Sequence, residues 1–135
     1  MVGHLAVPSI DSQMRPAAVS PVVIKDLLRT DLGFSGLILT DALNMLGAEG
    51  HSSADALAAG ADIVVAPDDT FAEIERVVKA VESGEIPVAE IDDRLKRVLF
   101  FKYLATVADP PGEARKSSQS LHTSLSDTLA HRLLR

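Results

Sequence analysis

Two short runs of consecutive apolar residues constrain the fold of this chain most strongly. Residues 36–40 read GLILT and residues 62–66 read DIVVA, and neither run alternates polar with apolar side chains. Strands without alternation are buried on both faces, as in parallel sheets that helices cover. Residues 1–7, MVGHLAV, form a third apolar run. We therefore expect three buried parallel strands.

A helix with clear end signals is expected between the first two strands. Ser20 is a natural N-cap, and Pro21 suits the first helical position because the N–H that it lacks would have no partner there. Gly33 stands where a left-handed residue commonly ends a helix. The sequence therefore predicts a helix over residues 21–32.

Three more helices are predicted after it. A short helix covers residues 53–59 and ends at Gly60. Thr70 and Glu73 match a capping box that opens the next helix, and the last helix covers residues 88–104. Helical spacing assigns to the core-facing sides of these last two helices the residues Ile74, Val77, Val78, Val81, Ile91, Leu95, Val98 and Leu99.

The resulting order is strand, helix, strand, helix, strand, helix, helix. This alternation is typical of α/β folds with parallel strands and right-handed crossovers. The amino-acid composition of the chain changes near residue 106. Residues 106–120 are rich in Pro, Gly and Ser and predict a linker. The remaining residues have a weak helical pattern.

The composition excludes several classes of protein. The chain has 135 residues, no cysteine and four scattered histidines, so disulfides and thiolate metal sites are excluded and no metal-ligand spacing is visible. A net charge of −6 and an aromatic content of 4% argue against a nucleic-acid partner. No apolar run approaches the about 18 residues of a membrane span. No signal peptide is visible, and the compartment stays open.

The carboxyl ends of the predicted strands carry the candidate functional residues. Asp41 directly follows the run at residues 36–40, and His4 and Asp68 lie at the ends of the other two runs. In parallel α/β folds the chemistry takes place beyond these ends. A carboxylate there can act as a nucleophile, a base, a metal ligand or a phosphate acceptor.

Other charged residues have plain structural explanations. Asp62 is expected to make a turn or a backbone contact, and Asp68 and Asp69 are expected to cap the next helix. A solvated helix face is expected from Asp92, Asp93, Arg94, Lys96 and Arg97.

The order of several longer motifs resembles one enzyme family. Residues 16–45, PAAVSPVVIKDLLRTDLGFSGLILTDALNM, are similar to the helix, strand and (S/T)-D segment in the N-terminal barrel domain of glycoside hydrolase family 3. Residues 1–8, 56–67 and 86–102 resemble the preceding strand, the final barrel strand and the closing helices. The resemblance covers residues 1–104, and the sequences of the matching motifs are similar to those of the bacterial β-N-acetylhexosaminidase-like members.

The resemblance implies a fold and an activity. Residues 1–105 would be the C-terminal portion of an incomplete (β/α)8 TIM-type barrel, about its last three β/α units, and residues 106–135 a linker and the start of a truncated second domain. The activity would be hydrolysis of O-glycosidic bonds, with retention, in carbohydrate metabolism. Asp41 would be the nucleophile, Met45 would line the sugar subsite, and His4 would bond a sugar hydroxyl or Asp41.

The same resemblance implies the partners. The substrate would be a β-linked glycoside or one that contains N-acetylglucosamine. The resemblance implies no metal and no cofactor for the protein. The family takes its acid/base from a histidine on a Lys-His loop or from a glutamate outside the barrel, and this chain has no such Lys-His motif. A full barrel takes about 250 residues. We therefore expect a fragment that is inactive alone and that a complementing N-terminal fragment would complete.

Two other interpretations remain open at this stage. A non-catalytic sugar-binding remnant, or pseudoenzyme, fits the missing acid/base. A phospho-accepting receiver-like domain also places an aspartate after an apolar parallel strand. Such a domain needs an acidic pair after its first strand and a lysine after its last, and this chain has neither.

Overall fold

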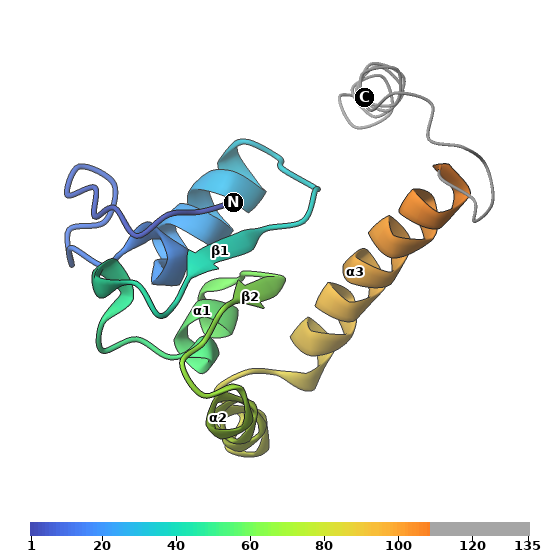
Figure 1. Ribbon diagram of the computed structural model, residues 1–135. Coiled ribbons are helices and arrows are strands. Elements are labelled where there is room, and N and C mark those ends of the chain that lie inside the picture. The colour runs from blue at the N-terminus through green and yellow to red at the C-terminus, as the bar shows by residue number, and fades with distance from the viewer. Residues whose placement is uncertain (109–135) are drawn as a thin grey trace. The chain divides into compact units, whose positions relative to one another are not determined.

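The computed structural model describes residues 1–108 (Figure 1). By its internal contacts the chain divides into two units, Met1–Val98 and a second that starts at Leu99. The elements are η1 (Ala17–Val19), η2 (Val22–Asp31), β1 (Leu39–Ala42), η3 (Leu46–Ala48), α1 (Ser53–Ala59), β2 (Ile63–Val65), α2 (Thr70–Glu82) and α3 (Val88–Ala108). None of the helices described is long and apolar enough to span a membrane. The predicted helical tail lies outside the described residues, and α3 extends beyond residue 104.

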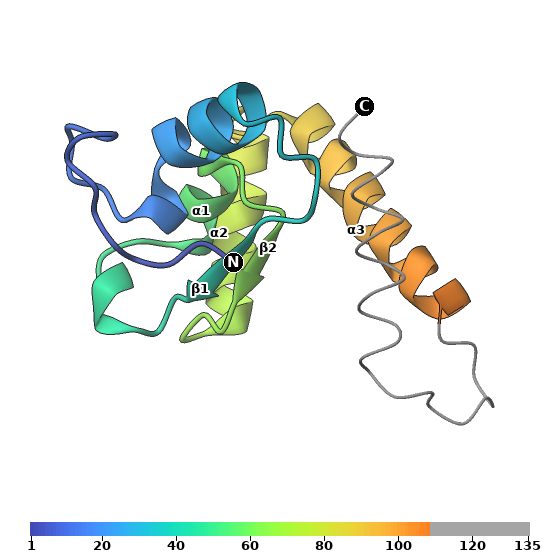
Figure 2. The same cartoon turned by 90° about the horizontal axis from the view of Figure 1, so that it is seen from above.

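The sheet consists of two parallel strands, β1 and β2, that lie side by side (Figures 1 and 2). An isolated parallel bridge joins Val2 to Thr40, and the Val2 N–H donates to the Leu39 carbonyl at 2.8 Å. The N-terminal segment therefore lies along the other edge of β1. Its direction is as predicted, but it contributes a bridge and not a full strand over residues 1–7.

Helices cover one face of this sheet. The main core cluster consists of Val19, Ile24, Ile38, Ala56, Ala59 and Ala61, with Val2, Leu28 and Val64 packed against it. Because strand side chains alternate between faces, Leu39, Ile63 and Val65 point to the other face, where they are only half-buried. The prediction of strands buried on both faces is therefore wrong within residues 1–108.

The helix predicted over residues 21–32 is present as η2. The Ser20 hydroxyl accepts a hydrogen bond from the Val23 N–H at 3.3 Å, and Gly33 has a left-handed φ of +62°. The helix is wound with π-type hydrogen bonds, from residue i to i+5. The sequence signals locate the ends of this helix but not its winding.

Helix α1 matches the prediction for residues 53–59. It ends at Gly60, which has a φ of +110°, a value that a residue with a Cβ rarely adopts. Ser52 and Asp55 form a reciprocal capping box at its start.

The start of α2 differs from the prediction. The Asp69 carboxylate accepts hydrogen bonds from two backbone N–H groups of the first turn, at 3.0 and 3.1 Å, so Asp69 is the N-cap, as one interpretation expected. Glu73 does not close a capping box with Thr70. Its carboxylate accepts from the Ser53 N–H at 2.6 Å, which ties the start of α2 to the start of α1. The longer-range bond replaces the local one.

Part of each predicted apolar helix face is exposed. Ile74 and Val78 on α2 expose 54% and 48% of their surface, and Leu95 and Leu99 on α3 expose 52% and 54%. The inward orientation predicted for these four residues is wrong. The half-buried members of the two predicted faces are Val77, Val81, Ile91 and Val98. Periodicity identifies an apolar face but not how much of it a neighbour covers.

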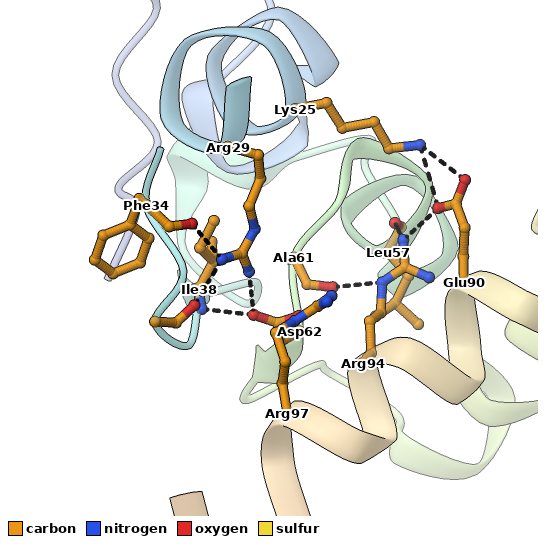
Figure 3. Close-up of polar contacts among 11 residues, drawn as sticks. Lys25, Arg29, Phe34, Ile38, Leu57, Ala61, Asp62, Glu90, Arg94 and Arg97 are labelled. Atoms are coloured by element: carbon orange, nitrogen blue, oxygen red, sulfur yellow. Dashed lines mark hydrogen bonds and ion pairs between the residues drawn. The ribbon is translucent and has the colours of Figure 1, made fainter. Parts of the chain in front are cut away.

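A buried carboxylate, that of Asp62, lies directly before the first residue of β2 (Figure 3). The Asp62 side chain is fully buried and pairs with Arg29 at 2.6 Å and with Arg97 at 2.8 Å. It also accepts from the Ile38 N–H at 2.8 Å. The predicted backbone contact of Asp62 is present, but the two ion pairs were not predicted, because their partners lie on distant parts of the sequence.

Arg94 extends this network on α3 (Figure 3). It is 5% exposed and donates to the carbonyls of Ala61 and Leu57, at 3.0 and 2.7 Å, and to Glu90 at 2.8 Å. The first two bonds satisfy carbonyl groups at and beyond the end of α1. The predicted solvated helix face is therefore wrong at Arg94.

Candidate active site

Asp41 lies near the carboxyl end of β1, inside the strand and not directly after it as predicted. Its backbone N–H donates to the Val2 carbonyl at 2.8 Å, and its Oδ1 accepts from the Ala42 N–H at 2.9 Å. The residue is half-buried. A carboxylate held in this way at a strand end is accessible to a ligand and can act as a nucleophile or a base.

The pairing of the two strands changes register next to this aspartate. Leu39 lies opposite Ile63 and Ala42 lies opposite Val65, so β1 advances three residues while β2 advances two. Thr40, which is fully buried, bridges the irregularity because its hydroxyl accepts from the Val65 N–H at 3.0 Å. Bulges of this kind re-aim side chains and are common beside active sites. The sequence offered no signal for this role of Thr40.

His4 lies beside β1 but does not bond the Asp41 carboxylate. Its Nε2 is 3.0 Å from the Ala42 carbonyl, so this nitrogen carries the proton, because a carbonyl can only accept. The Nδ1 atom is buried and has no partner in the described part of the chain. A Cβ on Gly47 would lie 2.8 Å from the Cβ of His4, so the backbone at Gly47 packs directly on the histidine.

Met45 joins the same small cluster. Its backbone N–H donates to the Ala42 carbonyl at 3.1 Å, and its side chain is 49% exposed. The backbone of Ala42 therefore bonds all three residues: its N–H donates to the Asp41 carboxylate, and its carbonyl accepts from His4 and from the Met45 N–H. The structure brings the three residues that the sequence singled out together at the carboxyl end of β1.

The end of β2 contributes to this site mainly through its backbone and less through its side chains. Ala66 has a left-handed φ of +43°, which is strained for a residue with a Cβ, and its carbonyl accepts from the Asn44 N–H at 3.2 Å. This bond ties the segment after β2 to the segment after β1. Asp68, the third strand-end candidate, is exposed.

The loop between the N-terminal segment and η1 is organised by a second buried carboxylate. Asp11 is 2% exposed and accepts from Arg15 at 2.7 Å and from the Ser20 hydroxyl at 2.6 Å. The Arg15 guanidinium and the Ser20 hydroxyl lower the pKa of Asp11 to about 2. Sequence reasoning missed this residue, because Asp11 and Arg15 lie in a loop, where spacing along the sequence gives no signal of contact.

The described residues offer no metal site. No group of three or more His, Cys, Asp or Glu side chains gathers closely enough to hold an ion within residues 1–108.

Comparison with known proteins identifies the family. Residues 1–101 match the Glycosyl hydrolase family 3 N terminal domain. The chain belongs to this family. Family 3 structures include a β-N-acetylglucosaminidase from a Paenibacillus species, which is 33% identical and superimposes with a TM-score of 0.70 over 82% of this chain and 22% of that one. The fold is therefore that of an α/β, TIM-like domain.

Two curated β-hexosaminidases are also similar to this chain. A β-hexosaminidase from Chromobacterium violaceum is 47% identical over 70 residues, or 48% of this chain and 19% of that protein. The β-hexosaminidase LpqI from Mycobacterium tuberculosis is 35% identical over 115 residues, or 76% of this chain and 29% of that protein. The family 3 chain described here thus spans less than a third of the length of each of these relatives.

Proposed function

We propose that this chain supplies the nucleophile of a retaining family 3 glycosidase, with Asp41 as the residue that bonds the sugar. The proposed substrate is a β-linked glycoside that contains N-acetylglucosamine, the class that the names of its relatives indicate. The observation that carries the proposal is the cluster of Asp41, His4 and Met45 around the backbone N–H and carbonyl of Ala42, in a chain that belongs to this family.

The reaction has two displacements. The Asp41 carboxylate forms a bond to the anomeric carbon while the bond from that carbon to the glycosidic oxygen breaks, and the departing oxygen takes a proton from a general acid. A water molecule then attacks the same carbon and gives its proton to the conjugate base. The bond to Asp41 breaks, and the sugar leaves with its original configuration.

Each residue of the cluster has a role in this proposal. The hydrogen bond from the Ala42 N–H limits the rotation of the Asp41 carboxylate. His4 Nε2 holds the Ala42 carbonyl and so positions the backbone beside the nucleophile. Met45, half exposed beside them, gives the sugar an apolar surface.

The general acid is not among these residues, so we propose that residues outside this sequence supply it. We propose that residues 1–105 correspond to the last three β/α units of an eight-stranded barrel and act together with a complementing N-terminal fragment. General acid–base catalysis is worth roughly 10²–10⁴-fold. The chain alone should therefore turn over ordinary glycosides very slowly.

The test uses a substrate that needs no acid to leave. The 2,4-dinitrophenyl β-glycoside of N-acetylglucosamine releases a stable phenolate, while the missing base slows the second step. The glycosyl-enzyme should therefore accumulate, and intact-mass and peptide mass spectrometry should find it on Asp41. Asp41→Asn should remove the adduct. An adduct on another residue would reject Asp41 as the nucleophile, and saturable binding with no adduct would favour a non-catalytic sugar-binding protein.

A further inference from the structure

The loop over residues 7–15 has both of its ends fixed beside β1. The N-terminal segment runs parallel to β1, and at its end Ala6 forms an antiparallel bridge with Pro16. The Ala17 N–H donates to the Leu5 carbonyl at 3.0 Å and strengthens this base. The loop therefore leaves and returns at the carboxyl end of β1, where the candidate active site lies. In Figures 1 and 2 the loop and η3 both lie on the side to which the β1 arrow points.

One buried carboxylate holds the interior of this loop. Asp11 is 2% exposed, and its carboxylate accepts from the Gln13 N–H at 3.0 Å as well as from Arg15 and Ser20. The Asp11 backbone N–H donates to the Val7 carbonyl at 2.9 Å. These bonds fix the loop from inside, so the side chains on its outer surface are carried by a well-defined backbone.

The outer surface of the loop carries two apolar side chains. Ile10 is 41% exposed and Met14 is 56% exposed. Met14 has a φ of +59°, a left-handed conformation that is uncommon for a residue with a Cβ. Among residues 1–108, Ala66 at the end of β2 is the only other non-glycine residue with a positive φ. Both strained residues thus lie at the end of the sheet that carries Asp41, and such strain clusters at ligand-binding sites.

The position of the loop indicates which part of a substrate it reaches. The base of the loop, at Ala6, lies two residues beyond His4, and an extended chain advances about 3.3 Å per residue, so the loop begins roughly 7 Å beyond the histidine. The leaving group is bonded to the same carbon that Asp41 attacks, whereas the hydroxyls at C3 and C4 lie across the sugar ring. The part of the substrate that lies beyond the sugar and next to that carbon is the leaving group.

We propose that Ile10 and Met14 form an apolar contact surface for the leaving group and so favour β-glycosides whose leaving group presents an apolar face, such as an aryl group. This inference rests on the proposed function, because it takes the sugar to be bound at Asp41. It goes beyond that function by assigning specificity to a loop outside the Asp41 cluster. Methionine suits the role because its flexible thioether adapts to apolar groups of different shape.

The methionines of the chain make the test direct. The sequence contains three, Met1, Met14 and Met45, so methyl-labelled methionine gives three NMR signals from the full chain. The ligands are the phenyl and the methyl 1-thio-β-glycosides of N-acetylglucosamine, whose sulfur linkage resists hydrolysis. The phenyl glycoside should shift Met14 and Met45, and the methyl glycoside should shift Met45 alone. Met1, which is 83% exposed at the start of the N-terminal segment, is the internal control and should not respond.

Variants measure the size of the contact, with affinities taken from the Met45 signal. The phenyl glycoside should bind about five- to tenfold more tightly than the methyl glycoside, because the ring buries more apolar surface. Ile10→Ser and Met14→Asn should each reduce this ratio to about twofold or less. Asparagine is chosen at Met14 because it tolerates a left-handed backbone. Leu32→Ser changes a similarly exposed apolar residue that precedes β1, and the ratio should stay as in the unaltered chain.

The outcomes separate this inference from the proposed function. A Met45 signal that responds to both ligands while Met14 responds to neither would overturn the inference and leave the sugar site in place. Equal responses of Met14 to both ligands, or a ratio of affinities that Ile10→Ser and Met14→Asn leave unchanged, would also overturn it. A response of Met14 but not Met45 to the phenyl glycoside would support the contact and refute the placement of the sugar. No response at either methionine would overturn both.

Discussion

The two ends of the same small sheet use their carboxylates in opposite ways. At the amino-terminal end, Asp62 is fully buried and pairs with Arg29 and Arg97. At the carboxyl end, Asp41 is half-buried, and its side chain accepts a hydrogen bond from Ala42. One carboxylate is committed to holding three distant parts of the chain together, and the other remains accessible to a ligand.

This difference teaches how stability and chemistry are separated in a parallel α/β fold. The network around Asp62 joins η2 and α3 to the start of β2, so removing it should loosen the whole first unit. The cluster around Ala42 is local, and changes there should alter reactivity more than folding. The following variants test that separation.

The largest effect on stability is expected at Asp62. Asp62→Asn leaves two arginines beside an uncharged side chain, and breaking a buried pair in this way costs about 3–5 kcal/mol. Asp41→Asn, the matched change at the other end, should cost about 1 kcal/mol or less. Urea unfolding of both variants measures the difference. Equal losses of unfolding free energy would show that the two ends of the sheet contribute equally to stability.

A smaller loss is expected at Arg94. Arg94→Met keeps the buried stem but removes the donors to the Leu57 and Ala61 carbonyls, which should cost about 2–3 kcal/mol. Lys96→Met on the same helix breaks only an exposed pair with Asp93 and should leave the unfolding midpoint unchanged. Similar midpoints for the two variants would contradict the structural role given to Arg94.

Thr40 tests whether the bulge depends on one hydroxyl. Thr40→Val removes the acceptor of the Val65 N–H without changing shape, and the loss should be about 1–2 kcal/mol. Thr40→Ser keeps the hydroxyl and should recover about half of that loss. Thermal unfolding, together with hydrogen exchange at Val65, distinguishes the variants. Unchanged exchange at Val65 in Thr40→Val would mean that the hydroxyl does not hold this amide.

The smallest effect depends on pH and concerns Asp11. Its pKa is lowered in the folded chain to about 2, so the unfolded chain binds the proton more readily. The stabilisation is complete above the unfolded pKa of about 4 and is lost as the pH falls from about 4 to about 2. Asp11→Asn should make the melting temperature less dependent on pH in that window. An unchanged slope would assign the acid sensitivity to other carboxylates.

The sequence predicted the local features of this fold well. The ends of η2 and α1 follow from Gly33 and Gly60, whose left-handed backbone conformations almost require glycine. The parallel order followed from the apolar runs. The candidate cluster followed from a motif, because Asp41 and Met45 are close in sequence.

The long-range features could not be predicted in the same way. The partners of Asp62 and Arg94 lie tens of residues away, and a charge on a helix predicts solvent unless its neighbours are known. The cap of α2 was misassigned to Thr70 because Glu73 bonds α1 instead. Ile74 and Val78 have the pattern of core residues, yet about half of the surface of each is left uncovered by the described residues.

The role of Asp41 is tested most directly by replacing its carboxylate with an external nucleophile. Asp41→Ala, mixed with the complementing fragment and the dinitrophenyl glycoside, should be inactive and should regain turnover when azide is added. The product should be the glycosyl azide of inverted, α configuration, because azide then attacks from the side that Asp41 occupied. A product of retained configuration, or azide that accelerates the unaltered chain equally, would contradict Asp41 as the nucleophile.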